Sequence, residues 1–217
     1  MVTRAAPGGR RIRRRRSQEE RREATRGAVL DATVECLAER GYAGTTTTRI
    51  ASRARVSRGA LLHYYASKVE LLTSAIEHIL RRREQEFRAA FAALPADADR
   101  RAAAIDILWR MVSGSTFYAW LELVVAARSD RQLLREVSRI TTQFTDTVIA
   151  TYRELFAEAA PPNVRFDLVP AFTFAFLQGL ALDRIAIADD QRVRELLAVL
   201  KDLATVVLGP NPRPPGA

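Results

Sequence analysis

The chain has very few of the residues from which disulfides, metal sites and common active sites are built. Its 217 residues include one cysteine, Cys36, and two histidines, His63 and His78. One cysteine cannot form an internal disulfide, and the two histidines do not have zinc-ligand spacing. HExxH, GxSxG, Walker A and GxGxxG motifs are missing as well. We therefore predict no catalytic residues, no metal, no cofactor and no enzyme activity.

Long hydrophobic runs are also scarce. The longest uncharged apolar stretch, residues 168–182, contains Pro170 and Gln178 and is shorter than the roughly 18 residues of a membrane span. The N-terminus is basic but lacks the apolar core of a secretory signal. We expect a cytoplasmic protein without a membrane partner.

Acidic residues are missing where basic residues are densest. The formal net charge is +9, and residues 1–16 contain seven arginines and no acid. Residues 17–68 have a small basic excess, whereas residues 69–217 are almost neutral. This gradient predicts an anionic partner at the N-terminal end and a different task for the larger part of the chain.

Apolar residues recur at intervals of three and four rather than two, which predicts an all-α protein. Cys36 falls on the apolar face of the first helix and is predicted to be a core residue, and Gly41 is predicted to stop that helix. The helices are expected at about 20–40, 46–54, 58–65, 67–93, 101–113, 116–128, 130–159, 166–188 and 190–208.

These helices group into two predicted domains between two tails. An N-terminal three-helix domain with a helix-turn-helix, residues 20–82, is joined by a long helix to a C-terminal helical bundle, residues 83–209. The Arg-rich residues 1–19 are predicted to be a flexible arm, and the Pro-rich residues 210–217 a disordered tail.

The two short helices carry clear capping signals. Thr45 and Thr46 precede the first, Ser57 precedes the second, and Ser67 forms a capping box with Glu70 before the long helix. In the second short helix, the periodicity directs Ser57, Leu61 and Tyr65 towards the bundle. The opposite face is expected to meet a major groove, with Arg58, Gly59, Leu62 and His63.

At these residues the chain resembles the DNA-binding domain of the TetR family of bacterial transcriptional regulators. The resemblance spans roughly residues 22–75 and involves three motifs: Gly41-Tyr42-x-x-Thr45-Thr46, then Ile50-Ala51-x-x-Ala54-x-Val56-Ser57-x-Gly59-Ala60-Leu61, then His63-Tyr64-Tyr65-x-Ser67-Lys68-x-Glu70-Leu71-Leu72.

Two positions depart from the family pattern. Arg55 stands where the family usually has glycine, so the turn either tolerates a side chain or is strained. Leu62 stands where the family usually has tyrosine, which removes a hydroxyl that often meets a phosphate. Both changes bear on operator sequence and affinity.

The resemblance implies a set of DNA contacts on the two short helices and the start of the long one. Arg58 is expected to read guanine, whereas hydroxyls, Tyr64 and Lys68 position the phosphate backbone. His63 could instead be an ordinary surface residue and Tyr64 a core residue, and Arg49 and Arg53 could form only a solvated face. The predicted contacts are Thr46, Thr48, Arg55, Ser57, Arg58, Gly59, Leu62, His63, Tyr64 and Lys68.

The arm offers two alternatives. Its arginines, residues 10–16, could enter a minor groove beside the recognition helix or could add only nonspecific attraction.

In the larger domain, the stretch 117–123 followed by 127–130 resembles a recurrent segment of the family's regulatory domain. The last two helices are apolar on more than one face, which predicts a four-helix bundle across a two-fold axis; the alternative is a monomer with a buried hairpin. The predicted interface residues are Phe172, Ala175, Phe176, Gly179, Leu196, Leu200 and Leu203.

The same domain is expected to contain an apolar effector pocket with a few polar groups. Arg110, Glu122 and Asp183 are the charged residues expected to matter for a charged ligand. Each predicted lining residue taken alone could instead be a core residue. The predicted lining residues are Trp109, Met111, Phe117, Tyr118, Trp120, Phe144, Phe174 and Gln178.

The resemblance implies a DNA-binding transcriptional regulator. We expect a homodimeric repressor that binds a palindromic double-stranded DNA operator and is released by an unknown small-molecule effector, with the long helix as the lever between the domains. An activator or nucleoid-type protein of the same fold is the first alternative. The second is a helical small-molecule-binding protein or enzyme with an incidental basic arm.

Overall fold

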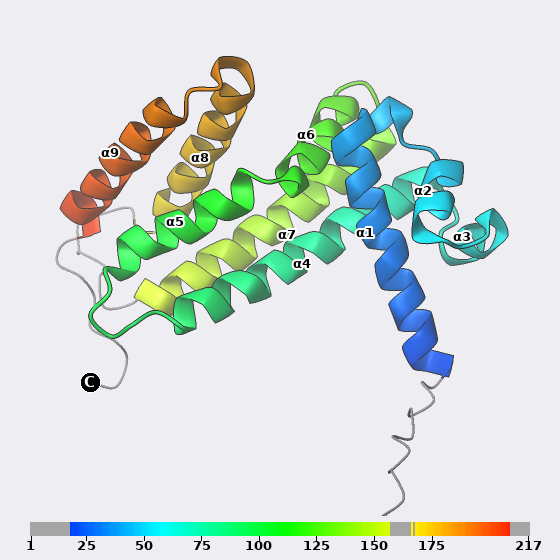
Figure 1. Cartoon of the computed structure of the whole chain (residues 1–217), viewed down its shortest axis with the longest axis horizontal. Helices are drawn as coiled ribbons and strands as arrows, with labels where there is room; N and C mark the ends of the chain where they lie inside the picture. Colours follow the sequence, from blue (N-terminus) through cyan, green and yellow to red (C-terminus); the bar gives the residue numbers. More distant parts are fainter. Residues whose placement is uncertain (1–17, 157–165, 167, 209–217) are drawn as a thin grey trace, which may run out of the picture.

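The computed structural model describes residues 18–156, 166 and 168–208, and every regular element in these residues is an α-helix (Figure 1). The all-α prediction is confirmed, and the helices agree with the predicted ones to within a few residues. The arm and the tail lie almost entirely outside the described residues, as does the predicted end of the seventh helix. The helices are α1 Gln18–Gly44, α2 Thr47–Ala54, α3 Arg58–Tyr64, α4 Lys68–Ala92, α5 Arg100–Val112, α6 Ser115–Ala127, α7 Arg131–Phe156, α8 Leu168–Ile187 and α9 Asp190–Leu208.

Side-chain caps begin the helices of the DNA-binding region. The Ser57 hydroxyl accepts a hydrogen bond from the Ala60 amide at 3.1 Å, and the Ser67 hydroxyl accepts one from the Glu70 amide at 3.0 Å. The Glu70 carboxylate accepts in turn from the Ala66 amide at 2.8 Å. The predicted capping box is therefore present, and it holds the short loop that redirects the chain from α3 into α4.

Gly41 interrupts α1 three residues before its end. Its backbone has φ 66° and ψ 178°, a combination that is essentially restricted to glycine. The predicted helix stop at Gly41 is thus present as a break in the helical backbone, although a further turn carries α1 to Gly44. This break directs the chain into α2.

The helices form an elongated body with α1–α3 at one end and α8–α9 at the other (Figure 1). The long helices α4 and α7 pack side by side between the two ends, and α5 contacts both α8 and α9. The position of the DNA-binding helices is therefore set by elements that also reach the far end of the molecule.

One apolar core joins the two predicted domains. It combines buried residues of α1–α4 with residues of α6 and α7, among them Leu37, Leu123 and Leu133, each at most 1% exposed. Cys36 lies in this core, 4% exposed, and burial raises the pKa of its thiol, as expected of a packing residue rather than a nucleophile. The predicted division between residues 82 and 83 falls inside α4, where no chain break or linker separates the two parts.

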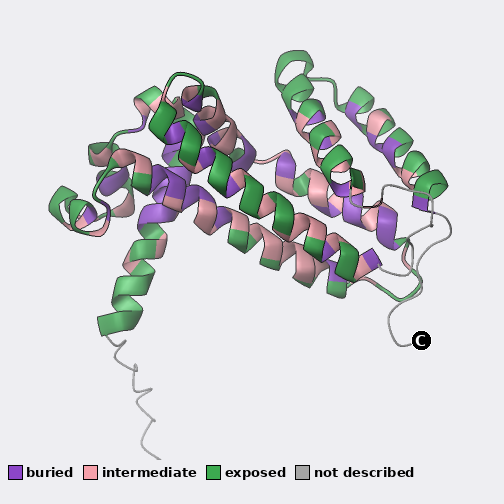
Figure 2. Cartoon of the chain, turned by 180° about the vertical axis from the view of Figure 1, so that it is seen from behind, coloured by how far each residue is buried: buried purple, intermediate pink, exposed green. Residues whose placement is uncertain are grey.

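The second core fills the other end, where buried residues of α8 and α9 pack on α5 and α6. The outer faces of α8 and α9 are exposed over much of their length (Figure 2). By length and composition alone α8 could span a membrane. It nevertheless carries Asp183 and Arg184 and packs through Leu177 and Ala181, both fully buried, as a helix of a folded bundle does.

Candidate nucleic-acid interface and ligand cavities

The recognition helix α3 is anchored on one side and free on the other. Leu61 and Tyr65 are 1% and 3% exposed and belong to the first core. Ser57, predicted to point the same way, is instead exposed, because it stands before the first turn and caps it. Arg58, Leu62 and His63 lie on the free side.

Eight of the ten predicted DNA contacts are exposed, and the other two are half-buried. Tyr64 is one of the half-buried residues and packs against the first core, with its ring 5.9 Å from that of His63. Leu62 is unusual because a large apolar side chain is 47% exposed on a recognition helix. Such a group suits contact with a thymine methyl.

Arg55 occupies the turn between α2 and α3 in the left-handed conformation, with φ 56° and ψ 40°. Its amide donates to the Ser52 carbonyl oxygen at 3.2 Å and ends α2. Of the two readings of this departure from the family pattern, the structure supports a strained left-handed backbone at a residue other than glycine.

The arginines of α2, α3 and the turn between them fall into two groups. Arg53 forms ion pairs with Glu39 and with Glu35 of α1, and its hydrogen bonds to the Glu39 carboxyl lower the pKa of that group. Arg49 donates to the Gly44 carbonyl oxygen at 2.7 Å. Within the described residues Arg55 and Arg58 have no such partner and are exposed, so they are the cations left to meet an anionic partner.

Lys68 already has an internal contact. Its Nζ donates to the Tyr42 carbonyl oxygen at 2.9 Å and lies 4.2 Å from the centroid of the Tyr42 ring. Burial lowers the pKa of this lysine. Lys68 therefore joins the start of α4 to the end of α1, a role that the sequence motif did not reveal.

Tyr42 also connects the DNA-binding region to α6. Its amide donates to Oε2 of Glu122 at 2.9 Å, and a Cβ on the neighbouring Gly41 would lie 2.7 Å from the same oxygen. Glu122, predicted to matter for a ligand, instead accepts this interdomain hydrogen bond. The other two charged candidates, Arg110 and Asp183, are exposed and line neither of the two cavities described next.

Two adjoining cavities lie between the helices of the larger domain. The Trp120 cavity, about 290 Å³, lies between α4, α5, α6, α7 and α8. The Arg101 cavity, about 90 Å³, lies between α4, α5, α7, α8 and α9. They share the walls Met111, Phe144, Val148, Pro170 and Phe174.

Six of the eight predicted lining residues contact these cavities. Met111, Phe144 and Phe174 line both, and the Trp120 cavity also has Phe117, Trp120 and Gln178. Trp109 and Tyr118 line neither, because they face the second core between α5, α6, α8 and α9. The prediction missed the polar residues of the Arg101 cavity: Glu84, Arg101, Thr151, Tyr152 and Thr173.

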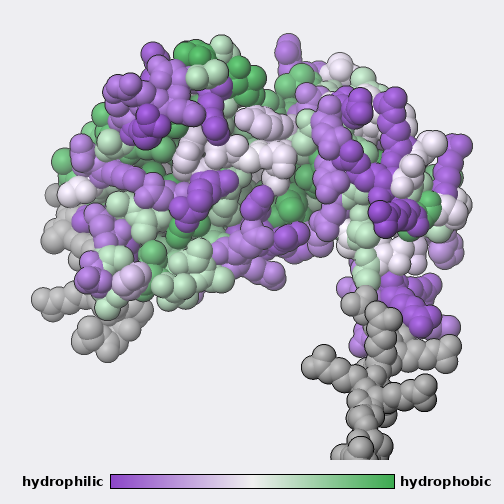
Figure 3. Space-filling view, viewed as in Figure 1, coloured by the Kyte–Doolittle hydropathy of each residue, from purple (hydrophilic) through white to green (hydrophobic). Residues whose placement is uncertain are grey.

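Exposed large apolar side chains gather on α8 and α9. These two helices carry nine of the twelve such side chains in the described part of the chain, including Phe172 at 58% and Val206 at 81%. Figure 3 shows apolar side chains beside charged ones over these helices. Of the predicted interface residues, Phe172, Ala175, Gly179 and Leu203 are exposed, and Phe176 and Leu196 are half-buried.

Leu200 corrects the predicted interface. It is 3% exposed and packs in the second core, because α9 directs this residue inward against the other helices of its own chain. We therefore exclude it from the exposed apolar surface.

Comparison with known proteins agrees with the geometry of α1–α4. Residues 29–75 match the family model for bacterial regulatory proteins of the tetR family. A helix-turn-helix transcriptional regulator of Mycobacterium tuberculosis is 30% identical over 85% of this chain and 97% of its own length. The regulator BetI of Burkholderia thailandensis is 27% identical over 88% of this chain and 96% of its own.

The fold is shared over nearly the whole length as well. A TetR-family transcriptional regulator from Rhodococcus superimposes with a TM-score of 0.68 at 19% identity, covering 86% of this chain and all of the other. With the exposed recognition helix, the family model and the full-length relatives in agreement, the chain belongs to the TetR family of helix-turn-helix transcriptional regulators.

Proposed function

We propose that this regulator is a homodimeric repressor that binds a near-palindromic operator and leaves it when a small molecule occupies the larger domain. The observation that carries the proposal is the pair of surfaces at opposite ends of the chain. One is the exposed side of α3 with Arg58, Leu62 and His63, and the other is the exposed apolar surface of α8 and α9. The first suits a major groove and the second suits a copy of itself.

The role of each DNA contact follows from its chemistry. Arg58 can donate two hydrogen bonds to guanine, and Leu62 can pack on a thymine methyl. The exposed hydroxyls of Thr46 and Thr48 and the half-buried Tyr64 and Lys68 suit phosphates, which fix orientation rather than sequence. Arg55 suits a phosphate too, because it projects from the turn beside α3.

Pairing through α8 and α9 would relate two recognition helices by a two-fold axis. Such a dimer requires half-sites about 34 Å apart, one turn of DNA, or a multiple of it. Each protomer reads its half-site with a recognition helix of only seven residues. Both half-sites must therefore be occupied for tight binding. A DNA-bound regulator of this kind works in the cytoplasm.

The cavities provide the place for an effector, and two connections carry its effect. The helix α4 lines both cavities and continues to Lys68, while α6 lines the Trp120 cavity and carries Glu122, which holds Tyr42. A ligand that favours a different arrangement of α4 and α6 therefore shifts the spacing of the recognition helices. The size of the shift is limited by the ligand's preference for one arrangement.

Selection of bound sequences from a random DNA pool tests the proposal. We expect an inverted repeat, bound by a dimer, and a reporter placed behind it should be silenced by the protein. Arg58→Ala should weaken binding about tenfold or more and relax the sequence preference at one position of each half-site. Arg110→Ala removes the same charge from an exposed position of α5 and should leave binding unchanged.

The outcomes separate the alternatives. Recovery of sequences without a repeat would argue for nucleoid-type binding, and stimulation of the reporter would identify an activator. Deletion of residues 1–16 should lower both affinity and its dependence on salt if the arm contacts phosphates. An unchanged salt dependence would mean that the arm makes no such contacts.

A further inference from the structure

The Arg101 cavity contains a cation that its apolar surroundings do not explain. Arg101 is 5% exposed, and most of the other side chains around the cavity are apolar, including Phe87, Leu108 and Phe156. Removing a guanidinium from water costs several kcal/mol unless an anion or acceptors replace the water. Arg101 therefore requires an anion or hydrogen-bond acceptors close to its guanidinium.

The described residues provide few acceptors for the Arg101 guanidinium. The Nε and Nη1 atoms of Arg101 are buried and have no hydrogen-bond acceptor among them. The nearest carboxylate oxygen, Oδ1 of Asp99, is 3.8 Å from Nε, beyond hydrogen-bond distance. This oxygen already accepts from the amides of Arg101 and Ala102 as the cap of α5.

The other charged groups at the cavities have closer ion pairs than Arg101, whose Nε lies 3.8 Å from Oδ1 of Asp99. Glu84, in the same cavity, has Nε of Arg88 at 3.1 Å. Arg83, the cation of the Trp120 cavity, has Oε2 of Glu86 at 2.8 Å and also donates to Thr116, although its buried Nε has no partner among the described residues. Neither needs a ligand to balance its charge.

A second donor lies in the same cavity. The hydroxyl of Tyr152 is buried and has no partner among the described residues. Burial raises the pKa of this phenol far above its ordinary value, so it stays protonated and can donate. Two guanidinium nitrogens and a hydroxyl, all without acceptors among the described residues, lie in one apolar cavity and match a carboxylate, whose two oxygens accept several hydrogen bonds.

The adjoining Trp120 cavity gives the apolar part of such a molecule its place. The two cavities share five lining residues, so a flexible chain can pass from one into the other by rotating the side chains between them. A cavity on the order of 150 Å³ already holds benzene, and the Trp120 cavity is about 290 Å³.

We propose that the two cavities form one site for an amphipathic carboxylate, with the carboxylate held by Arg101 and Tyr152 and the apolar chain in the Trp120 cavity. This inference rests on the proposed function, because it names the chemical class of the effector. It distinguishes such an anion from a neutral or cationic molecule of the same shape, since only the anion balances the charge of Arg101.

Calorimetry with three ten-carbon probes tests the site: decanoate, decan-1-ol and decylammonium, each below its aggregation limit. We expect decanoate to bind at least about tenfold more tightly than decan-1-ol, and decylammonium to bind most weakly. Decanoate should also weaken operator binding by the same protein.

Two variants examine the two donors. Arg101→Gln should lower decanoate affinity at least about tenfold and leave decan-1-ol affinity unchanged, and Tyr152→Phe should lower decanoate affinity about fivefold. Arg110→Gln, on the exposed side of the same helix, is the matched control and should change neither. Thermal unfolding shows whether each variant is folded; if Arg101→Gln is not, Tyr152→Phe decides.

Three results would overturn the inference: equal affinity for decanoate and decan-1-ol, no binding of any probe, or no effect of either variant on decanoate. Operator binding, measured on the same preparations, separates this failure from that of the proposed function. A protein that binds its operator but not decanoate refutes only the ligand class. A protein that binds no operator refutes the proposed function itself.

Discussion

Arg55 is the residue at which the backbone of the helix-turn-helix is most strained. At its φ of 56° the Cβ comes too close to the following carbonyl oxygen, a contact that glycine avoids, and this costs about 1–2 kcal/mol. The strain is tolerated because the Arg55 amide ends α2 and the side chain adds a free cation beside α3. Arginine at this position therefore lowers the stability of the fold and adds a positive charge to the proposed DNA-binding surface.

Arg55→Gly should therefore stabilise the protein while weakening its contact with phosphates. We expect the free energy of unfolding in urea to rise by about 0.5–1 kcal/mol. This is less than the strain energy because glycine also increases the conformational entropy of the unfolded chain. The salt dependence of operator binding should fall with the lost cation. Ser52→Gly, at an exposed helical position of α2, should instead lose about 0.5 kcal/mol, and a loss in both variants would refute the strain.

Gly41 differs from Arg55 because no other residue fits there. Its backbone conformation is unfavourable for any residue with a Cβ, and an added Cβ would clash with a neighbour. Gly41→Ala should cost about 2–3 kcal/mol, because the φ and ψ are glycine-only and the new Cβ meets Glu122 at 2.7 Å. Gly27→Ala is the control, because it lies in the same helix with nothing within 4 Å of the added Cβ. It should be stabilising by about 0.5–1 kcal/mol.

The outcome also reports on the link to α6. If the clash contributes, Glu122→Ala should recover part of the loss in the Gly41→Ala background while leaving the backbone strain. Equal effects of the two glycine substitutions in urea unfolding would contradict the tight junction between α1 and α6.

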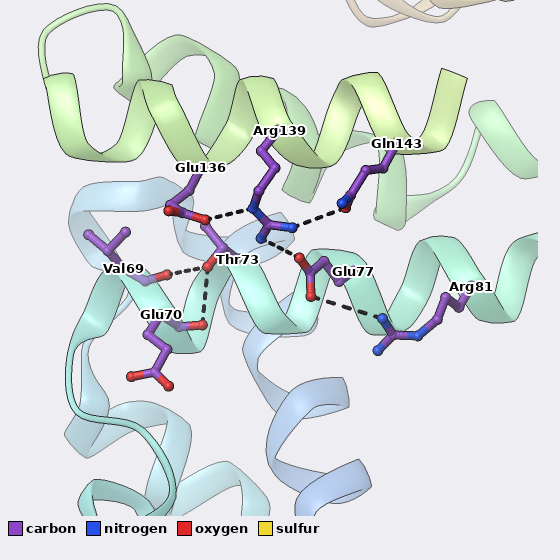
Figure 4. A network of polar contacts seen from close by, with 8 residues as sticks. All are labelled: Val69, Glu70, Thr73, Glu77, Arg81, Glu136, Arg139 and Gln143. Carbon is purple, nitrogen blue, oxygen red and sulfur yellow. Dashed lines mark hydrogen bonds and ion pairs between the residues drawn. The ribbon is translucent and has the colours of Figure 1, made fainter. Parts of the chain in front are cut away.

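At the scale of elements, Arg139 ties the lever helix α4 to α7. It pairs with Glu77 of α4, and its guanidinium donates to Oε2 of Glu136 at 3.1 Å and to Oε1 of Gln143 at 3.0 Å (Figure 4); the Arg139 side chain is exposed. These contacts hold α4 against the helix that forms the opposite wall of both cavities. In the proposed function these contacts would oppose a movement of α4 relative to α7.

Arg139→Ala should lower the free energy of unfolding by about 0.5–1 kcal/mol at low salt and by less in 1 M salt, since the pairs are exposed and screened. Arg135→Ala, also exposed on α7 and without an ion pair in the described part of the chain, should change it little. Equal losses would mean that the network adds nothing to helix stability.

For the whole molecule, the decisive feature is the apolar surface of α8 and α9. Phe172→Glu combined with Leu203→Glu places two charges on this surface, where burial against a partner would be costly. We expect sedimentation to show a dimer for the natural sequence and a monomer for the double variant, with weaker operator binding. Val125→Glu, at a 54% exposed apolar residue of α6, should remain dimeric. A natural sequence that is monomeric at micromolar concentration would exclude the proposed dimer.

The predictions that succeeded concern interactions between neighbours in the sequence. The caps at Ser57 and Ser67, the stop at Gly41 and the burial of Cys36 depend on residues within one or two helical turns. Leu200 was assigned wrongly because helical periodicity identifies an apolar face but not the neighbour it meets. Trp109 and Tyr118 were assigned to the pocket for the same reason, although they pack against the second core.

The sequence by itself therefore determined the all-helical class, the family and the recognition helix, because these follow from local spacing and from motifs that adjoin one another. Only the tertiary structure decided that Glu122 holds Tyr42 and that Arg101 and Tyr152 line one apolar cavity. These residues come from different helices, and their contacts depend on how those helices pack. In the helix-turn-helix, only the structure shows that Arg53 is paired with Glu39 and that Arg55 and Arg58 have no ion-pair partner within the described residues.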